Sequence, residues 1–348
     1  MTTTEPTAAP QRGRHAAAAL VGVAVSVLLL WWSMRNVDLA EVGGHLRSAR
    51  LTPLLAGVAI ATLTFVIRAI RWNYFLRSDA DEEVPWGPRW HSVAIGFMAN
   101  NLLPFRAGEI IRALAISRLG RVRMAAAITS LVVERVLDAL ALVSLFVLGL
   151  FLSGLPPATT VLGVSVARAA TVAAALGTVA IGAGLVMVIW PHWTEVVLRR
   201  LLPEGRLRAR LISIGHGITS GLSVLRSPAR IALVAAWSLV LWLVNGLSFF
   251  VMFKAFDIDV GVTGALILQG ALALGVSVPS TPGYVGPFEA AIVAVLELYA
   301  VPSSKAFSYA MAYHASTFLP IVLLGFWSLL RTPLAFRDLR RTTAAVAE

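Results

Sequence analysis

The stretch Asn100-Asn-Leu-Leu-Pro-Phe-Arg-Ala-Gly-Glu-Ile-Ile-Arg112 places three charged side chains inside a long apolar region of the chain. These charged residues are Arg106, Glu109 and Arg112. Pro104 and Gly108 would interrupt a helix at this point. Non-helical backbone is tolerated at membrane depth only where it is packed in protein or lines a polar cavity. The stretch therefore predicts a broken helix in the interior of a membrane protein.

The composition of the whole chain agrees with this prediction. Of 348 residues, 58% are hydrophobic and 14% are charged, and the mean hydropathy is +0.80. Several apolar runs reach the roughly 20 residues that a helix needs to cross about 30 Å of hydrocarbon. The alternating pattern typical of a membrane β-barrel is missing from the sequence. We therefore expect an all-α integral membrane protein.

The formal net charge of +11 comes from arginines that fall mostly in a few connecting loops. This distribution orients a polytopic protein and holds it against anionic lipid headgroups, so we expect no nucleic-acid partner. The sequence has no cysteine, which excludes disulfides and thiolate metal ligands. We expect neither a metal site nor a cofactor.

Six uninterrupted apolar runs are predicted to cross the membrane. They lie at about 16–34, 51–67, 124–152, 168–190, 231–253 and 305–330. Two further apolar regions, 90–116 and 262–301, are interrupted near their middle by Pro and Gly. If the basic loops are cytoplasmic, the six spans alternate only when each interrupted region enters and leaves on one side.

The sequence therefore predicts two re-entrant helical hairpins. Region 90–116 would open to the cytoplasm and region 262–301 to the outside, as an inverted repeat would produce. In an alternative with eight transmembrane helices, 262–279 and 283–301 each cross the membrane. Both arrangements place both termini in the cytoplasm.

Three segments have other expected roles. Residues 1–15 are expected to be a disordered cytoplasmic N-terminus, and 332–348 a basic cytoplasmic tail after the membrane domain 16–331. In 204–226, Leu and Ile recur at steps of three and four with arginines between them. This pattern predicts an amphipathic helix on the inner membrane surface, although an ordinary helix packed under the bundle fits equally well.

The interrupted regions suggest an anion site. A broken helix exposes the N-terminus of its second half, whose partial positive charge and free N–H groups face anionic substrates in many transporters. Arg106 and Arg112 would add full positive charge and a donor fork suited to phosphate. Glu109 would orient these arginines or exchange protons. Alternatively, Arg106, Glu109 and Arg112 neutralise one another at the cytoplasmic rim.

A second interrupted motif, Pro279-Ser-Thr-Pro-Gly-Tyr-Val-Gly-Pro-Phe-Glu289, is of the same Pro–Gly–Glu type. Gly283 and Gly286 would break the helix there, and Glu289 would position the arginines or transfer protons. Tyr313 and His314, in the last apolar run, are weaker candidates for contact with a proton or substrate.

Charged residues also interrupt the third long apolar run. In Glu134-Arg135-Val-Leu-Asp138, the two acids share one helix face, because they stand four residues apart. Charges at that depth cost about 3 kcal/mol each unless they face a polar interior. We expect Glu134, Arg135 and Asp138 to form a charge network, in which pairing with Arg106 or Arg112 is the simplest arrangement.

Arg68 and Arg71 stand one turn apart after the second apolar run. We interpret them as cytoplasmic anchors or headgroup contacts. Catalytic patterns are missing from the sequence: we find no glycine-rich phosphate loop, no helical His-Glu metal motif and no nucleophile elbow. The Glu134 and Asp138 pair could serve an intramembrane transferase, but the chain is not expected to be an enzyme.

With these residues identified, the chain resembles the lysylphosphatidylglycerol synthase transmembrane-region family, a flippase-like membrane module. The module occurs alone or as the amino-terminal half of the bacterial multiple-peptide-resistance factor. The resemblance covers about residues 16–331. It rests on Asn101-Leu-Leu-Pro-Phe-Arg-Ala-Gly-Glu109 with Arg112, on Glu134-Arg135 with Asp138, on Pro279 to Glu289 and, more weakly, on Arg68-Ala-Ile-Arg71-Trp72.

In fused members, the resemblance implies that a soluble domain makes aminoacylated phosphatidylglycerol and the membrane module moves it to the outer leaflet. Because this sequence ends at Glu348 without such a domain, we do not expect transfer of lysine from tRNA. We expect a flippase-like transporter that moves an anionic phospholipid or glycolipid between leaflets of a bacterial cytoplasmic membrane. The expected substrate-binding residues are Asn101, Arg106, Glu109, Arg112, Gly283, Gly286 and Glu289.

An alternative function is a membrane subunit that binds a polyprenyl-phosphate-linked sugar and presents it to a separate glycosyltransferase. The expected partners are thus a membrane lipid and, in the alternative, a lipid-modifying enzyme or glycosyltransferase. A homo-oligomer is compatible with the sequence.

Overall fold

The computed structural model describes residues 9–76, 78, 82–103, 107–156, 228–278 and 280–334, with a few isolated residues between 160 and 205. Nearly all residues of the expected span 168–190, of the expected amphipathic segment 204–226 and of the expected tail 332–348 lie outside the described residues. The described part is helical apart from two paired strands of two residues each. The prediction of an all-helical protein is confirmed.

The helices and strands follow one another along the chain in the following order. They are α1 (Ala9–Met34), α2 (Leu39–Ser48), α3 (Leu51–Trp72), α4 (Trp86–Leu102), α5 (Gly108–Leu119), α6 (Met124–Leu152), β1 (Thr160–Val161), β2 (Val164–Ser165), α10 (Pro228–Ala255), α11 (Val262–Gly275), the 3-10 helix η3 (Pro282–Tyr284), α12 (Pro287–Glu297) and α13 (Ser303–Leu330). Because α1 begins at Ala9, it includes part of the stretch 1–15 for which the sequence predicted disorder.

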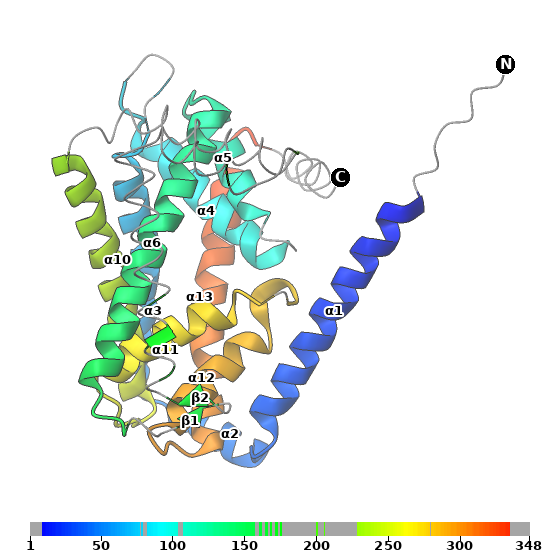
Figure 1. Ribbon diagram of the computed structural model, residues 1–348, viewed down its shortest axis with the longest axis vertical. Helices are drawn as coiled ribbons and strands as arrows, with labels where there is room; N and C mark the ends of the chain where they lie inside the picture. The colour runs from blue at the N-terminus through cyan, green and yellow to red at the C-terminus, as the bar shows by residue number, and fades with distance from the viewer. Residues whose placement is uncertain are drawn as a thin grey trace.

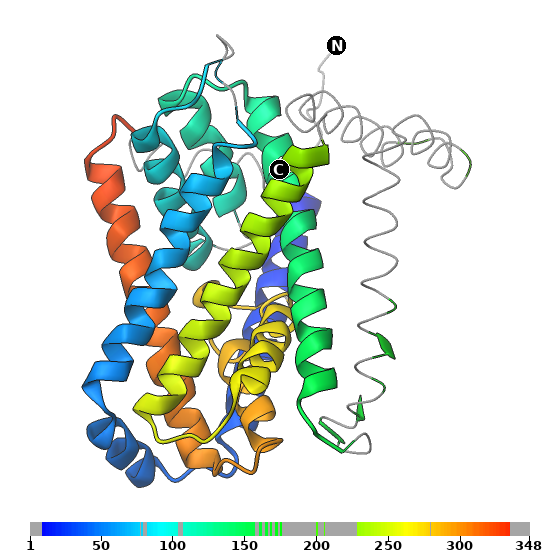
Figure 2. The same ribbon diagram turned by 90° about the vertical axis from the view of Figure 1, so that its left-hand side faces the viewer.

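Four of the described helices, α3, α6, α10 and α13, are long and apolar enough to cross a membrane. The segments Leu20–Met34 and Leu39–Ser48 pass the same test together, although they are bent by 80°. These helices correspond to five of the six expected spans. Figure 2 shows α3, α6 and α10 running along the length of the bundle, with α10 packed against both of the others. The total of six spans stays a prediction, because most of 168–190 lies outside the described residues.

The bend between α1 and α2 has a local cause. The side chain of Asp38 caps α2 by accepting a hydrogen bond from the Ala40 N–H at 2.7 Å. The Asp38 N–H in turn donates to Ser304 Oγ at the start of α13, at 3.0 Å. The corner is therefore tied to the far end of the chain.

The two interrupted regions form helical hairpins, α4 with α5 and α11 with α12. The four helices have 17, 12, 14 and 11 residues, which corresponds to lengths of about 26, 18, 21 and 17 Å. Each is shorter than the roughly 30 Å of a hydrocarbon core. These lengths favour hairpins over two complete crossings by residues 262–301.

The two hairpins lie at opposite ends of the bundle. In Figure 1, α4 and α5 occupy the upper half, and α11 and α12 occupy the lower half. Their tips meet: a methyl group placed on Gly283 in η3 would lie 3.8 Å from the carbonyl oxygen of Asn101 at the end of α4. The arrangement agrees with the opposite orientations that the charge distribution predicted.

Close backbone contacts hold each hairpin in place. A Cβ on Gly108 would overlap the carbonyl oxygen of Gly96, so that α4 and α5 can approach this closely only with glycine at 108. Gly286 has a φ of 97°, and a Cβ there would overlap the backbone of Ser26 in α1. α1 therefore packs directly on the tip of the second hairpin.

Candidate functional site

Five charged side chains from three helices meet in the interior, and we call them the buried charge cluster. They are Arg68 and Arg71 of α3, Arg112 of α5, and Glu134 and Asp138 of α6. None of them is more than 7% exposed. The cluster joins the first hairpin to two of the long helices. The predicted pairing of Glu134 with Arg112 is present. The cluster also includes Arg68 and Arg71, which the sequence had not placed in the network.

Arg112 is held by Glu134. Its Nη1 and Nη2 atoms donate to Glu134 Oε1 and Oε2 at 2.8 and 3.0 Å, the two-point geometry in which guanidinium and carboxylate match best. The guanidinium also lies 4.0 Å from the centre of the Trp72 ring. Both of its terminal nitrogens are therefore engaged, and a phosphate would have to compete with Glu134 for them.

Asp138 binds the second arginine. Arg71 donates to Asp138 Oδ1 and Oδ2 at 2.5 and 3.2 Å, and Trp242 Nε1 donates to Oδ1 at 3.1 Å. Arg71 also lies 3.1 Å from Glu134 Oε1 and donates to Ser238 Oγ at 2.8 Å. These contacts connect α3 and α6 to α10.

Arg68 is the least strongly paired member of the buried charge cluster. Its Nη1 atom lies 3.3 Å from Asp138 Oδ2 and 3.7 Å from Glu134 Oε1. Within the cluster, three guanidinium groups face two carboxylates, which leaves one positive charge in excess. An uncompensated charge away from water is strongly unfavourable. The site is therefore suited to an anion that approaches Arg68.

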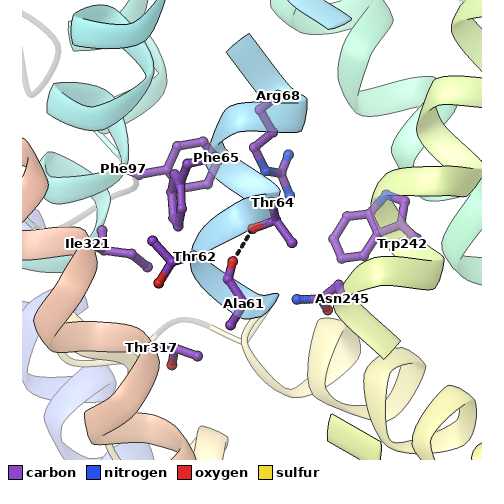
Figure 3. A pocket seen from close by; sticks show the side chains of 10 residues that line it. All are labelled: Ala61, Thr62, Thr64, Phe65, Arg68, Phe97, Trp242, Asn245, Thr317 and Ile321. Carbon is purple, nitrogen blue, oxygen red and sulfur yellow. Dashed lines mark hydrogen bonds between the residues drawn. The ribbon is translucent and has the colours of Figure 1, made fainter. Parts of the chain in front are cut away.

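A cavity of about 180 Å³ lies beside Arg68, between α3, α4, α10 and α13. Its lining consists of Ala61, Thr62, Thr64, Phe65, Arg68, Phe97, Trp242, Asn245, Thr317 and Ile321 (Figure 3). The Arg68 guanidinium lies between two aromatic rings, 4.9 Å from the centre of Phe97 and 5.4 Å from that of Trp242. The rings hold Arg68 at the edge of the cavity.

A more exposed ion pair borders the cluster. Arg135 Nη2 donates to Glu109 Oε1 at 2.5 Å, and the two side chains are 43% and 29% exposed. Glu109 thus pairs with Arg135, whereas the sequence suggested that it orients Arg106 or Arg112. Arg106 lies outside the described residues, and its expected role stays a prediction.

Glu289 stands in the Pro–Gly motif of the second hairpin, in the first turn of α12, and makes two hydrogen bonds. Glu289 Oε2 accepts from the Gly286 N–H at 2.7 Å, and Oε1 lies 2.6 Å from Nδ1 of His314 in α13. The His314 ring stacks on Phe288, with their centres 4.1 Å apart. Glu289 therefore already occupies the half-helix end at which the sequence predicted an anion.

The remaining predicted residues have simpler surroundings. Tyr313 is buried in an aromatic cluster, where its hydroxyl lies 2.6 Å from Ser248 Oγ and its ring stacks on Phe249. Gly283 and Asn101 lie together where the hairpin tips meet. Neither of them lines the cavity beside Arg68.

Sequence reasoning interpreted Arg68 and Arg71 as surface anchors, but the structure places both in the buried charge cluster. The sequence contained one signal of this pairing. Arg68 and Arg71 share a face of one helix, and Glu134 and Asp138 share a face of a second helix, so that the two faces are able to pair. Asn245 of the cavity was missed as well. An amide side chain within an apolar span of 28 residues was the available signal.

Comparison with known proteins agrees with this architecture. The sequence profile of the family described as "Lysylphosphatidylglycerol synthase TM region" matches residues 19–325. A UPF0104 membrane protein of Methanothermobacter thermautotrophicus is 24% identical over 287 residues, which cover 77% of this chain and 81% of the relative. A UPF0104 membrane protein of Methanocaldococcus jannaschii is 22% identical over 227 residues, which cover 65% of this chain and 90% of the relative.

A third relative is named Glycosyltransferase AglD, from Haloferax volcanii. It is 27% identical over 326 residues, which cover 85% of this chain but only 51% of the relative. The chain thus spans about half the length of that protein. The family match covers most of the chain and confirms the resemblance found in the sequence motifs. This chain is a multi-pass membrane protein that belongs to the lysylphosphatidylglycerol synthase TM region family.

Proposed function

We propose that this protein is a flippase-like transporter that moves an anionic phospholipid or glycolipid between the leaflets of a cytoplasmic membrane. One observation carries the proposal: a buried cluster with one positive charge in excess lies beside a cavity between long apolar helices. A phosphodiester headgroup carries one negative charge, which would neutralise the excess. The family membership supports a role that involves membrane lipids.

The arrangement of the hairpins supports movement across the membrane. In transporters built from inverted repeats, broken helices approach a central site from both sides. Here the tip of the first hairpin, near Asn101, meets the tip of the second, near Gly283, and the cavity is bordered by α4 of the first hairpin. Under this proposal the basic loops face the cytoplasm, as do both termini, and the protein performs no catalysis.

The proposal is tested with purified protein in liposomes that contain phosphatidylglycerol with a fluorescent headgroup-proximal label. Accessibility of the label to an impermeant quencher reports movement between leaflets. We expect Arg68→Gln to reduce this movement to the rate of empty liposomes. The matched control is Arg50→Gln, because the Arg50 side chain is 66% exposed and pairs with Asp257 outside the cluster. Equal rates for Arg68→Gln and the unmodified protein would refute the proposal.

A second candidate function is presentation of a polyprenyl-phosphate-linked sugar to a separate glycosyltransferase. The match to about half of a relative named as a glycosyltransferase favours it, because that relative contains both a segment like this chain and further sequence. Lipids that co-purify with the protein distinguish the candidates. Mass spectrometry should identify diacyl phospholipids if the first proposal is correct, and polyprenyl phosphates if the second is correct.

A further inference from the structure

The cavity wall beyond Arg68 carries hydroxyl groups that already donate their protons to backbone carbonyl oxygens. Thr62 Oγ1 donates to the Val58 carbonyl at 2.8 Å, and Thr317 Oγ1 donates to the Tyr313 carbonyl at 3.0 Å. Thr64 makes the same kind of bond to Ala61, which Figure 3 draws as a dashed line. A hydroxyl has a single proton and two lone pairs. These threonines therefore present acceptors to the cavity, and a ligand must supply the donors.

Asn245 adds a group that can both donate and accept. Its side-chain amide lines the same cavity and makes no hydrogen bond with the residues that the structure describes. In Figure 3 it lies between Trp242 and Thr317, on the side of the cavity away from the Arg68 backbone. An amide offers two N–H donors and a carbonyl acceptor. Such a group suits a ligand that carries hydroxyls.

Arg68 supplies the complementary chemistry at the other end of the cavity. In the described part of the chain, the Nη1 atom of Arg68 makes both of its ion pairs, with Asp138 and with Glu134. The other nitrogens of the guanidinium keep donors for a phosphate oxygen. The cavity thus combines donors for a phosphate at one end with acceptors for hydroxyls at the other.

We propose that this cavity selects a headgroup in which a phosphodiester is followed directly by a polyol, either glycerol or a sugar. This inference rests on the proposed function and specifies its substrate. Arg68 binds the phosphate, while Thr62, Thr317 and Asn245 bind the hydroxyls.

The test compares two lipids of equal charge. Phosphatidylglycerol and phosphatidylethanol are both phosphodiesters with one negative charge, but only the first carries headgroup hydroxyls. Binding of each lipid to the full-length protein in phosphatidylcholine nanodiscs is measured by native mass spectrometry. Two hydroxyl hydrogen bonds of ordinary strength predict a preference of about tenfold for phosphatidylglycerol.

Removing the hydroxyl acceptors should abolish that preference. In the double variant Thr62→Val/Thr317→Val, we expect phosphatidylglycerol to bind about tenfold more weakly and phosphatidylethanol to bind as before. The unchanged second lipid shows that the variant is folded. Thr332→Val is the matched control, because Thr332 also donates to a backbone carbonyl, that of Leu329, but does not line the cavity.

The outcomes separate this inference from the proposed function. Equal binding of both lipids by the unmodified protein would overturn the selection of polyols but leave an anionic-lipid transporter intact. Failure to bind either lipid above phosphatidylcholine would overturn both. A further comparison identifies the polyol. It uses methyl polyprenyl phosphate and glucosyl polyprenyl phosphate, which are both phosphodiesters with one negative charge. A preference for the glucosyl form larger than that for phosphatidylglycerol assigns a sugar, and a smaller one assigns glycerol.

Discussion

Arg112 and Glu134 form a two-point ion pair that is closed to solvent, with Nη···Oε distances of 2.8 and 3.0 Å. Arg112 comes from α5 of the first hairpin, and Glu134 comes from the long helix α6. The pair therefore fixes the hairpin to the bundle. Because both groups are buried, removal of Arg112 leaves Glu134 without its two-point partner, and removal of Glu134 leaves the cluster with two positive charges in excess.

This pair leads to a prediction about stability. Arg112→Gln should lower the free energy of unfolding by about 3–5 kcal/mol, because Glu134 loses two buried hydrogen bonds to a charged group, each worth about 1.5–3 kcal/mol. Arg135→Gln, which breaks the more exposed pair with Glu109, should cost about 1 kcal/mol or less. Denaturant titration of both variants in the same detergent measures the difference. Similar losses for the two variants would show that burial of the Arg112 pair is unimportant.

The close approach of α4 and α5 gives a second prediction. Gly108→Ala places a Cβ against the Gly96 carbonyl and should destabilise the protein by about 1–3 kcal/mol. Gly87→Ala in α4 is the control, because nothing lies within 4 Å of its Cβ. Alanine is also the better helix former, so the control should be neutral or slightly stabilising. Thermal unfolding of the two variants tests the contact, and a stable Gly108→Ala protein would argue against it.

The second hairpin gives a third prediction, which concerns Glu289. Glu289→Gln keeps an acceptor for the Gly286 N–H but loses the charge that faces His314, whereas Glu289→Ala loses both contacts. We expect Glu289→Ala to be less stable than Glu289→Gln by about 1 kcal/mol, the value of one helix cap. Melting temperatures measure this difference.

Measurements of lipid transport distinguish a structural role of Glu289 from a role in proton exchange. If Glu289 exchanges a proton during the cycle, Glu289→Gln should bind lipid normally but transport it slowly. Its transport should also lose the pH dependence that the unmodified protein shows. A variant that transports at the normal rate with the normal pH profile would leave Glu289 as a helix cap.

A fourth prediction concerns the orientation of the hairpins. The chain has no cysteine, so single cysteines can be introduced without background. Trp86→Cys, at the start of α4, should react with an impermeant thiol reagent from the cytoplasm, and Val262→Cys, at the start of α11, from the outside. Both positions are well exposed, at 43% and 56%. Reaction of both cysteines from the same side would contradict opposite orientations.

Ser280→Cys then decides between hairpin and full crossing for 262–301. In a re-entrant hairpin that opens to the outside, the thiol reagent reaches the tip from the outside. Eight complete spans would place residue 280 on the cytoplasmic side. Added phosphatidylglycerol should slow the reaction from outside if lipid enters between the hairpins.

The sequence by itself determined the helical membrane fold and the positions of its interruptions. Hydrophobic runs of about 20 residues and the Pro–Gly motifs before Glu109 and Glu289 are local properties. They therefore predicted α3, α6, α10 and α13 as well as both hairpins. The position of Glu134 and Asp138 within a long apolar run likewise marked them as charges that must face a polar interior.

Only the tertiary structure decided which charges meet. Arg112, Arg71 and Arg68 are all basic residues near apolar segments, and nothing in their local sequence distinguishes a paired arginine from one that faces a cavity. That distinction depends on how α3, α5, α6 and α10 approach one another, because an ion pair requires its atoms to lie within about 4 Å. The packing leaves Arg68 with the weakest pairing and places it beside Trp242 and Asn245, residues more than 170 positions away in the chain.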